Sequence, residues 1–182
     1  MKKPALTDRL LVRHWLTHPE ESAYEAAKHM NLSKRTVQFA AKRIKARTGI
    51  QRERLLEFLC ENPIAHKNIG FYHPNPNVWL RHPPVPVSLS GEDAAAVMGW
   101  DIVPNRHIFY IEATEVNTVV KSLLGTGGRL AEDMDQNISL RLRDKWMIDE
   151  PVPLVERGQR LVDYKESKNI QLLAGLEEGR WD

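Results

Sequence analysis

The sequence predicts an α+β fold with an N-terminal all-helical domain, a proline-rich connector and a small mixed α/β domain. Three observations lead to this prediction. Apolar residues up to position 61 recur at helical spacing, and six of the chain's eleven prolines fall between positions 62 and 87. Short β-branched and aromatic runs then alternate with helical patterns. We therefore expect three parts, at residues 1–61, 62–84 and 85–182.

The clearest helical pattern in the front part lies between Ser33 and Gly49. Its apolar residues recur at i, i+3, i+4 and i+7 and so share one face: Val37, Ala40, Ala41 and Ile44. The Ser33 hydroxyl can accept a backbone hydrogen bond as an N-cap, and Gly49 accepts the left-handed conformation common after a helix. The outward face is cationic, because residues 33–54 hold eight basic side chains and a single acidic one, Glu53.

A shorter helix is expected just before it, between Ser22 and Met30. Small apolar residues recur there at the same spacing: Ala23, Ala26, Ala27 and Met30. Ser22 and Glu25 match the capping-box pattern, in which two backbone donors are bonded reciprocally. Only Asn31 and Leu32 separate the two helices. A short helix, a tight turn and a longer basic helix form the helix-turn-helix arrangement.

Two more helices are expected in the front part. One begins at Thr7 or Asp8 and ends at Thr17, before Pro19, with its large apolar side chains inward: Leu11, Val12, Trp15 and Leu16. The other covers residues 50–61. No hairpin turn signal follows the basic helix, so we expect a helical module without a long β wing.

The run SKRTV at residues 33–37 is similar to the Ser-x-Arg-Thr-Val opening of recognition helices in many bacterial helix-turn-helix transcriptional regulators. The resemblance covers about residues 8–48. It implies a sequence-specific DNA-binding transcriptional regulator that inserts this helix into the major groove of double-stranded DNA. We expect such a regulator to act as a homodimer.

The predicted DNA contacts divide into base reading and phosphate anchoring. Gln38 suits a bidentate contact to adenine, Arg35 a contact to guanine, and Phe39 an apolar contact to a thymine methyl. Packing against the fourth helix or the connector is the alternative for Phe39. The remaining cations are expected on phosphates: Lys34, Lys42, Arg43, Lys45 and Arg47. The full predicted set is Ser33, Lys34, Arg35, Thr36, Gln38, Phe39, Lys42, Arg43, Lys45 and Arg47.

The charge of the chain is distributed unevenly. Residues 1–54 hold 13 Lys and Arg against 5 Asp and Glu, whereas residues 55–182 hold 13 against 19. The formal net charge of +2 therefore hides a positive front part and a negative rear part. This division favours a front part that faces nucleic acid and a rear part kept away from phosphates.

Residues 62–84 are expected to be an extended connector. Proline fixes φ and removes a backbone donor, so we expect neither a continuous helix nor a central strand there. Three histidines lie in this segment, and we expect them to be solvated rather than to form a metal cluster: His66, His73 and His82.

The rear domain is expected to alternate strands and helices. Predicted strands lie at residues 85–90, 107–113, 129–131 and 137–143, and predicted helices at 91–98, 115–125 and over much of 151–178. The order of the runs LSGEDAAAVMG, HIFYIEA and ERGQRLVDYKESKNIQLLAGLEE resembles the C-terminal domain of type IV abortive-infection antitoxins. That resemblance implies a partner, a nucleotidyltransferase toxin. The second hypothesis is therefore an antitoxin-like or adaptor protein that binds a protein through its acidic C-terminal domain.

No enzyme is predicted, and we expect no catalytic residues, no cofactor and no metal site. The run DYKE at residues 163–166 superficially suggests a metal-dependent nuclease, which is the third hypothesis, but the further acids that it needs cannot be placed. His14 and His18 have the i, i+4 spacing of metal ligands, and no third ligand is in sight.

The sequence predicts a soluble, cytoplasmic protein with no membrane segment. Pro4, Thr7 and Asp8 interrupt any apolar region near the start, and no apolar run reaches about 18 residues. Cys60 is the sole cysteine, which excludes an intramolecular disulfide and a thiolate metal cluster.

Overall fold

The computed structural model describes residues 4–132, 134–144, 147, 157–167 and 169–180. Helices together with a mixed sheet confirm the α+β class. The chain forms two compact units, Met1–Ala65 and His66–Asp182. Among the described residues, no helix combines the length and the apolar character needed to cross a bilayer.

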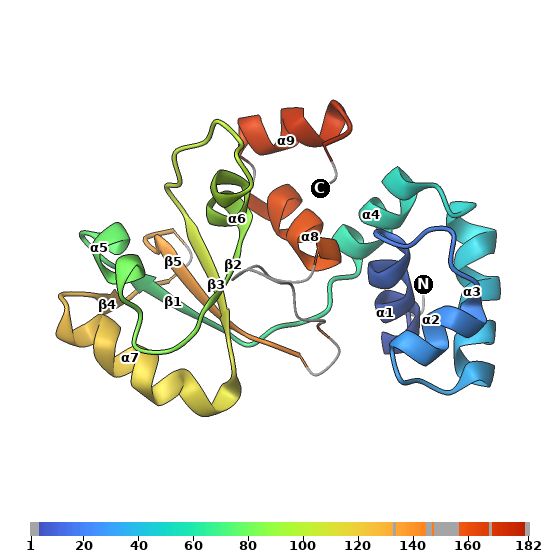
Figure 1. Cartoon of the computed structure of the whole chain (residues 1–182), viewed down its shortest axis with the longest axis horizontal. Coiled ribbons are helices and arrows are strands. Elements are labelled where there is room, and N and C mark those ends of the chain that lie inside the picture. The colour runs from blue at the N-terminus through green and yellow to red at the C-terminus, as the bar shows by residue number, and fades with distance from the viewer. Residues whose placement is uncertain (1–3, 133, 145–146, 148–156, 168, 181–182) are drawn as a thin grey trace. The chain divides into compact units, whose positions relative to one another are not determined.

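Within its described residues, the first unit consists of helices joined by loops (Figure 1). Its elements are α1 (Leu6–Trp15), α2 (Ala23–His29), α3 (Lys34–Thr48) and α4 (Arg52–Glu61). Helix α1 packs against both α3 and α4, and α2 packs against α3. The residues predicted to face inward are buried: Leu11, Val12, Trp15, Leu16, Val37, Ala40, Ala41 and Ile44. The predicted orientation of the first and third helices about their axes is therefore confirmed.

The turn between α2 and α3 is closed by backbone hydrogen bonds. Asn31 takes a left-handed conformation with a φ of 50°, which asparagine tolerates better than most residues. The N–H of Leu32 donates to the carbonyl of Ala27 over 2.9 Å, and the N–H of Asn31 donates to that of Lys28 over 3.2 Å. This pair of bonds is the Schellman motif, and it ends α2 sharply.

The helix ends match the predictions in part. Ser22 and Glu25 form the predicted capping box, and Gly49 is left-handed with a φ of 61°. Ser33 stands at the N-cap of α3, but its hydroxyl makes no capping bond, contrary to expectation. The fourth helix begins at Arg52 rather than near Ile50, because Ile50 also has a positive φ, 58°.

The second unit contains a five-stranded sheet in the order β2-β3-β5-β1-β4. Strands β3 and β5 run parallel, and the other neighbours are antiparallel. The strands are β1 (Asn68–Tyr72), β2 (Ser88–Ser90), β3 (His107–Ile111), β4 (Arg129–Leu130) and β5 (Ile138–Leu142). The helices are α5 (Pro76–Arg81), α6 (Gly91–Val97), the 3₁₀ turn η1 (Ala113–Glu115), α7 (Val116–Gly125), α8 (Arg157–Ser167) and α9 (Ile170–Glu177). The predicted strands and helices after residue 85 are therefore present, and residues 151–156 lie outside the described residues.

Helices cover both faces of this sheet (Figure 1). On one face, Phe109 and Ile111 of β3 share an apolar core with Trp79 of α5 and Val119 of α7. On the other face, α6 and α8 pack together, and Tyr110 of β3 points toward α8. Successive residues of β3 thus serve opposite faces, as the two-residue period of a strand requires.

Residues 62–84 do not form the extended connector that the sequence predicts. Strand β1 pairs with both β5 and β4, so this segment supplies an interior strand of the sheet. The strand fits between Pro63 and Pro74, where no proline interrupts the backbone hydrogen bonds. The second unit accordingly begins at residue 66 rather than 85.

The histidines of this segment also differ from expectation. His73 is buried and its Nε2 lies 3.1 Å from the Thr126 hydroxyl. His66 lies 3.3 Å from the Leu142 carbonyl. Of the three, only His82 is exposed as predicted.

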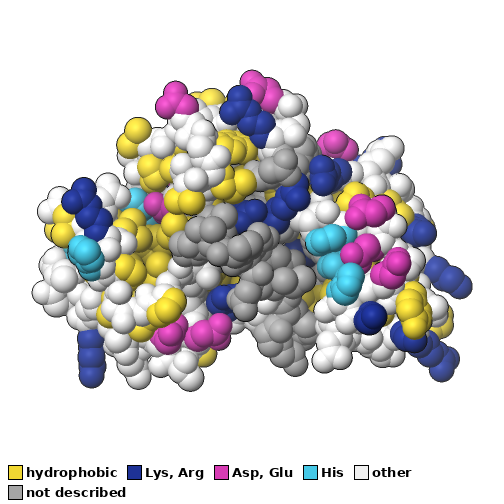
Figure 2. Space-filling model, in the orientation of Figure 1, with side chains coloured by type: hydrophobic (Ala, Val, Ile, Leu, Met, Phe, Trp, Pro, Cys, Tyr) yellow, Lys and Arg dark blue, Asp and Glu magenta, His cyan; other side chains and the backbone are white. Residues whose placement is uncertain are grey.

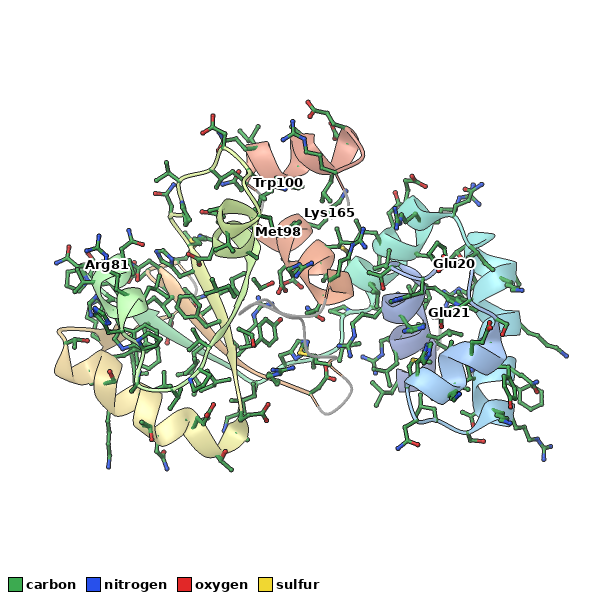
Figure 3. The ribbon with its side chains drawn as sticks, in the orientation of Figure 1. Glu20, Glu21, Arg81, Met98, Trp100 and Lys165 are labelled. Atoms are coloured by element: carbon green, nitrogen blue, oxygen red, sulfur yellow. The ribbon has the colours of Figure 1, made fainter. Side chains whose placement is uncertain are left out.

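The last helix packs closely on Trp100 (Figure 3). A Cβ added to Gly175 would lie 2.4 Å from Cζ3 of Trp100, so any larger residue would displace the indole. The same ring lies 5.5 Å from that of Tyr164, whose hydroxyl donates to the Met98 sulfur. An indole thus joins α9 to α8.

Enlarging a buried alanine of α2 tests the packing of the first unit. Ala27 is 1% exposed, whereas Ala46 lies on the outer face of α3. We expect Ala27→Leu to lower the free energy of unfolding by roughly 1–3 kcal/mol through overpacking, and Ala46→Leu to leave it nearly unchanged. Denaturant unfolding followed by circular dichroism measures both. Equal stabilities would mean that α2 and α3 do not pack through this face.

Candidate nucleic-acid interface

The structure leaves all ten predicted DNA-binding residues exposed: Ser33, Lys34, Arg35, Thr36, Gln38, Phe39, Lys42, Arg43, Lys45 and Arg47. They lie on α3 and its N-cap because the opposite face of the helix is buried by α1 and α2. Helix α3 carries six basic residues and no acidic one. Figure 2 shows Lys and Arg side chains projecting from the edge of the first unit where Figure 1 draws α3.

The three residues predicted to read bases lie on the N-terminal half of α3. Phe39 is 51% exposed, so its ring is not packed away against α4. The Arg35 guanidinium lies 5.9 Å from the centre of that ring, and Gln38 is exposed beside it. An apolar ring, a guanidinium and an amide are thereby offered together on one exposed surface, and each matches a base edge in the major groove.

Tyr24 of α2 joins this surface, and sequence reasoning missed it. The Lys34 ammonium donates to the Tyr24 hydroxyl over 2.7 Å and lies 3.9 Å from the centre of the ring. Tyr24 is half exposed. A phenol and an ammonium side by side can both donate to a phosphate oxygen. The sequence feature that could have identified Tyr24 is an aromatic residue in the first turn of a helix whose buried residues are all small.

The Arg43 side chain forms an ion pair within the protein. Its Nε lies 3.2 Å from Oδ2 of Asp8, a residue of α1 that is 4% exposed, and a second guanidinium nitrogen contacts the other carboxylate oxygen. The bond to Asp8 raises the pKa of the Arg43 guanidinium further. Arg43 thus holds α3 on α1, in addition to its predicted role on phosphate.

The remaining cations differ in how freely they project. The Arg47 guanidinium lies 5.2 Å from the centre of the Phe58 ring of α4. Lys42 and Lys45 are exposed on the surface of α3. These two lysines are therefore the best placed for phosphate anchoring along the helix.

The nuclease hypothesis places Asp163 at a metal, and the structure gives this carboxylate another role. Asp163 is fully buried and accepts hydrogen bonds from four side chains of the second unit: Ser90, Tyr110, Arg141 and Gln159. The distance to Arg141 Nη1 is 2.7 Å. Burial lowers the pKa of Arg141, but Asp163, Tyr110 and Glu166 together outweigh this effect and raise the pKa overall. A carboxylate with four donors has its lone pairs occupied, so it is part of a structural network.

A polar cavity of about 360 Å³ lies beside this network in the second unit. Two of its charged lining residues are engaged within the protein, since Arg141 bonds Asp163 and Glu166, and Glu92 accepts the backbone N–H of Asn105. A third, Arg106, is exposed at the cavity.

No protein-family model matches this chain, and neither a curated protein nor a solved structure does. The two family resemblances, to helix-turn-helix regulators and to antitoxins, stay predictions.

The ion pair between Arg43 and Asp8 gives a testable difference between neighbouring cations. We expect Arg43→Ala to lower the free energy of unfolding by roughly 1–3 kcal/mol, because it leaves the buried Asp8 carboxylate without its donor. The adjacent Lys42→Ala is the matched control and should stay within about 0.5 kcal/mol. Chemical denaturation of both variants makes the comparison. If the two were equally stable, Arg43 would be a free surface cation.

The network around Asp163 predicts a large loss of stability when the carboxylate is removed. Asp163→Ala removes the buried partner of Arg141 and the shared acceptor of Ser90, Tyr110 and Gln159, so we expect a loss of about 3–5 kcal/mol. Glu166→Ala removes the more exposed partner of the same guanidinium and should cost at most about 1 kcal/mol. Thermal unfolding separates the two variants. If Asp163→Ala were as stable as the parent, the role of Asp163 would not be structural, and the nuclease hypothesis would regain support.

Proposed function

We propose that this chain is a sequence-specific DNA-binding transcriptional regulator that inserts α3 into the major groove. The observation that carries the proposal is the exposed face of α3, where Arg35, Gln38 and Phe39 project together from a helix with six basic residues and no acidic one. Helix α3 has 15 residues, which corresponds to about 22 Å of length. A helix of ordinary diameter fits the major groove.

We assign base recognition and phosphate contacts to different residues of α3, according to the contacts and exposure of each side chain. The N-terminal half carries the groups that match base edges. Lys34 with Tyr24 at one end, and Lys42 and Lys45 further along, are the groups that we assign to phosphates. Phosphate contacts release counterions, so affinity should fall steeply with salt, by about 0.9 in log K per unit of log salt for each phosphate neutralised.

The proposal extends to the assembly. We infer that the regulator binds as a homodimer, because a single helix reads few base pairs and two copies would read two half-sites. Band shifts of the full-length chain on duplex DNA at several protein concentrations test this. Cooperative binding to a two-fold symmetric site supports the dimer.

Three alanine substitutions separate base reading from phosphate anchoring. On a duplex recovered by selection from a random pool, Arg35→Ala and Gln38→Ala should each cost roughly 1–3 kcal/mol, with a much smaller loss on a scrambled duplex. Lys45→Ala should weaken both duplexes alike and lower the salt slope by about one unit. Fluorescence anisotropy at several salt concentrations, with the full-length chain, measures all three. If Arg35→Ala and Gln38→Ala each lost as much affinity for the scrambled duplex as for the selected one, α3 would bind DNA without recognising its sequence.

A further inference from the structure

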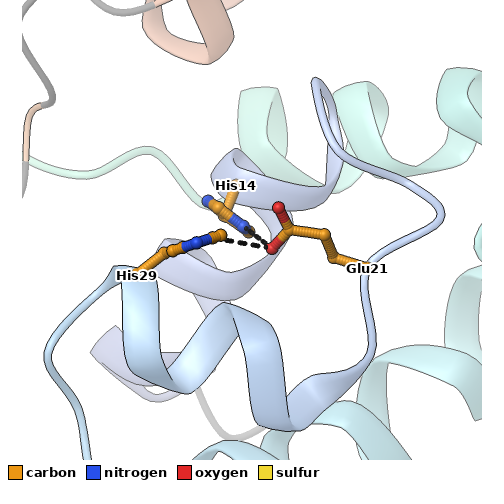
Figure 4. Close-up of side chains that lie close together, drawn as sticks. All are labelled: His14, Glu21 and His29. Carbon is orange, nitrogen blue, oxygen red and sulfur yellow. Dashed lines mark hydrogen bonds and ion pairs between the residues drawn. The ribbon is translucent and has the colours of Figure 1, made fainter.

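Three side chains capable of binding a metal come together in the first unit (Figure 4). His14 lies near the end of α1, Glu21 in the loop before α2, and His29 is the last residue of α2. Nε2 of His14 lies 2.8 Å from Oε2 of Glu21, and Nδ1 of His29 lies 3.0 Å from the same oxygen. The three atoms all lie within 4.8 Å of one another.

The sequence alone pointed to a different pair of possible metal ligands. His14 and His18 have the spacing of metal ligands on a helix, but the ring of His18 stacks on that of His14, with centroids 4.7 Å apart. The Nδ1 of His18 lies 2.8 Å from the Thr17 hydroxyl. The ligands that join His14 come instead from residues 21 and 29, which the loop and α2 bring back to α1. This return of the chain is a tertiary feature and leaves no periodic trace in the sequence.

We propose that His14, Glu21 and His29 form a binding site for a divalent transition metal, best suited to Zn²⁺, that fastens α2 to α1. Two imidazole nitrogens and one carboxylate oxygen are a ligand set that zinc accepts, with a water in the fourth position. Magnesium and calcium prefer oxygen ligands throughout, so the two histidines disfavour them. The metal takes the place of the protons that the two rings now share with Glu21.

The site is largely held in place before any metal arrives. The Trp15 indole donates to the Glu21 carbonyl over 3.0 Å, and the Glu21 N–H donates to the His18 carbonyl over 3.2 Å. The His14 side chain is 3% exposed and that of His29 is 52% exposed, so one ligand is buried and another is open to entering ions. Zinc bonds of 2.0–2.2 Å require each histidine nitrogen to move only slightly away from the Glu21 oxygen to which it is now hydrogen-bonded.

Protonation also favours metal binding. Burial lowers the pKa of His14 despite its bond to Glu21, and so favours the neutral imidazole. Burial by itself raises the pKa of Glu21, but the bonds to His14 and His29 outweigh it and lower the pKa overall. Neutral imidazole and ionised carboxylate are the forms that bind metals.

Titration of the full-length, tag-free chain with zinc chloride tests the site, after treatment with a chelator. Isothermal titration calorimetry should give one site per chain, and zinc should raise the unfolding temperature. We expect His29→Ala to weaken zinc binding by about 100-fold or more. This variant should still fold, because the His29 side chain is half exposed. His82→Ala, an exposed histidine of the second unit, is the matched control and should bind zinc like the parent.

Cobalt gives an independent readout of the same site. Co²⁺ bound by His14, Glu21 and His29 should show the intense visible absorption of a four-coordinate ion, and His29→Ala should abolish it. The proposal is overturned if His29→Ala binds zinc as tightly as the parent, or if His82→Ala loses binding to the same degree. It is also overturned if the parent chain shows no one-site binding at all.

Discussion

The close packing of α2 on α3 is the constraint on which the first unit depends. Ala26 and Ala27 of α2 are buried, as are Ala40 and Ala41 of α3, so the two helices meet through small side chains. Small residues allow two helices to approach closely. Helices α1 and α2 bury one face of α3, and the basic residues on its opposite face stay exposed. The candidate interface is thus a consequence of how α3 is buried.

Much of this unit could be predicted, because its information is local. The spacing of Val37, Ala40 and Ile44 identifies the buried face, and Ser22 with Glu25 marks the start of α2. Contacts between distant residues could not be predicted. Arg43 meets Asp8 across 35 positions, and no local pattern distinguishes this arginine from Lys42 or Lys45.

In the second unit too, local patterns were predictable and the contacts between distant residues were not. The strand over residues 107–111 was recognisable from its β-branched and aromatic residues. Strand β1 was missed, because proline content dominated the prediction for its neighbourhood and its partners β4 and β5 lie far along the chain. The pairing of Asp163 with Arg141 likewise exists only once α8 is packed on the sheet. Sequence patterns identify elements, whereas the clusters that suggest function arise where elements meet.

Contact between α3 and DNA is tested most directly by the protection of individual lysines from chemical modification. Full-length chain is treated with an amine-reactive reagent with and without duplex DNA, and the modified lysines are identified by mass spectrometry. Lys42 and Lys45 of α3, and Lys121 and Lys165 of the second unit, are all exposed and therefore reactive in the free protein. If α3 contacts DNA, the duplex protects Lys42 and Lys45 and leaves the reactivity of Lys121 and Lys165 unchanged. Protection of Lys121 and Lys165, with unchanged reactivity of Lys42 and Lys45, would mean that DNA binds elsewhere on the protein.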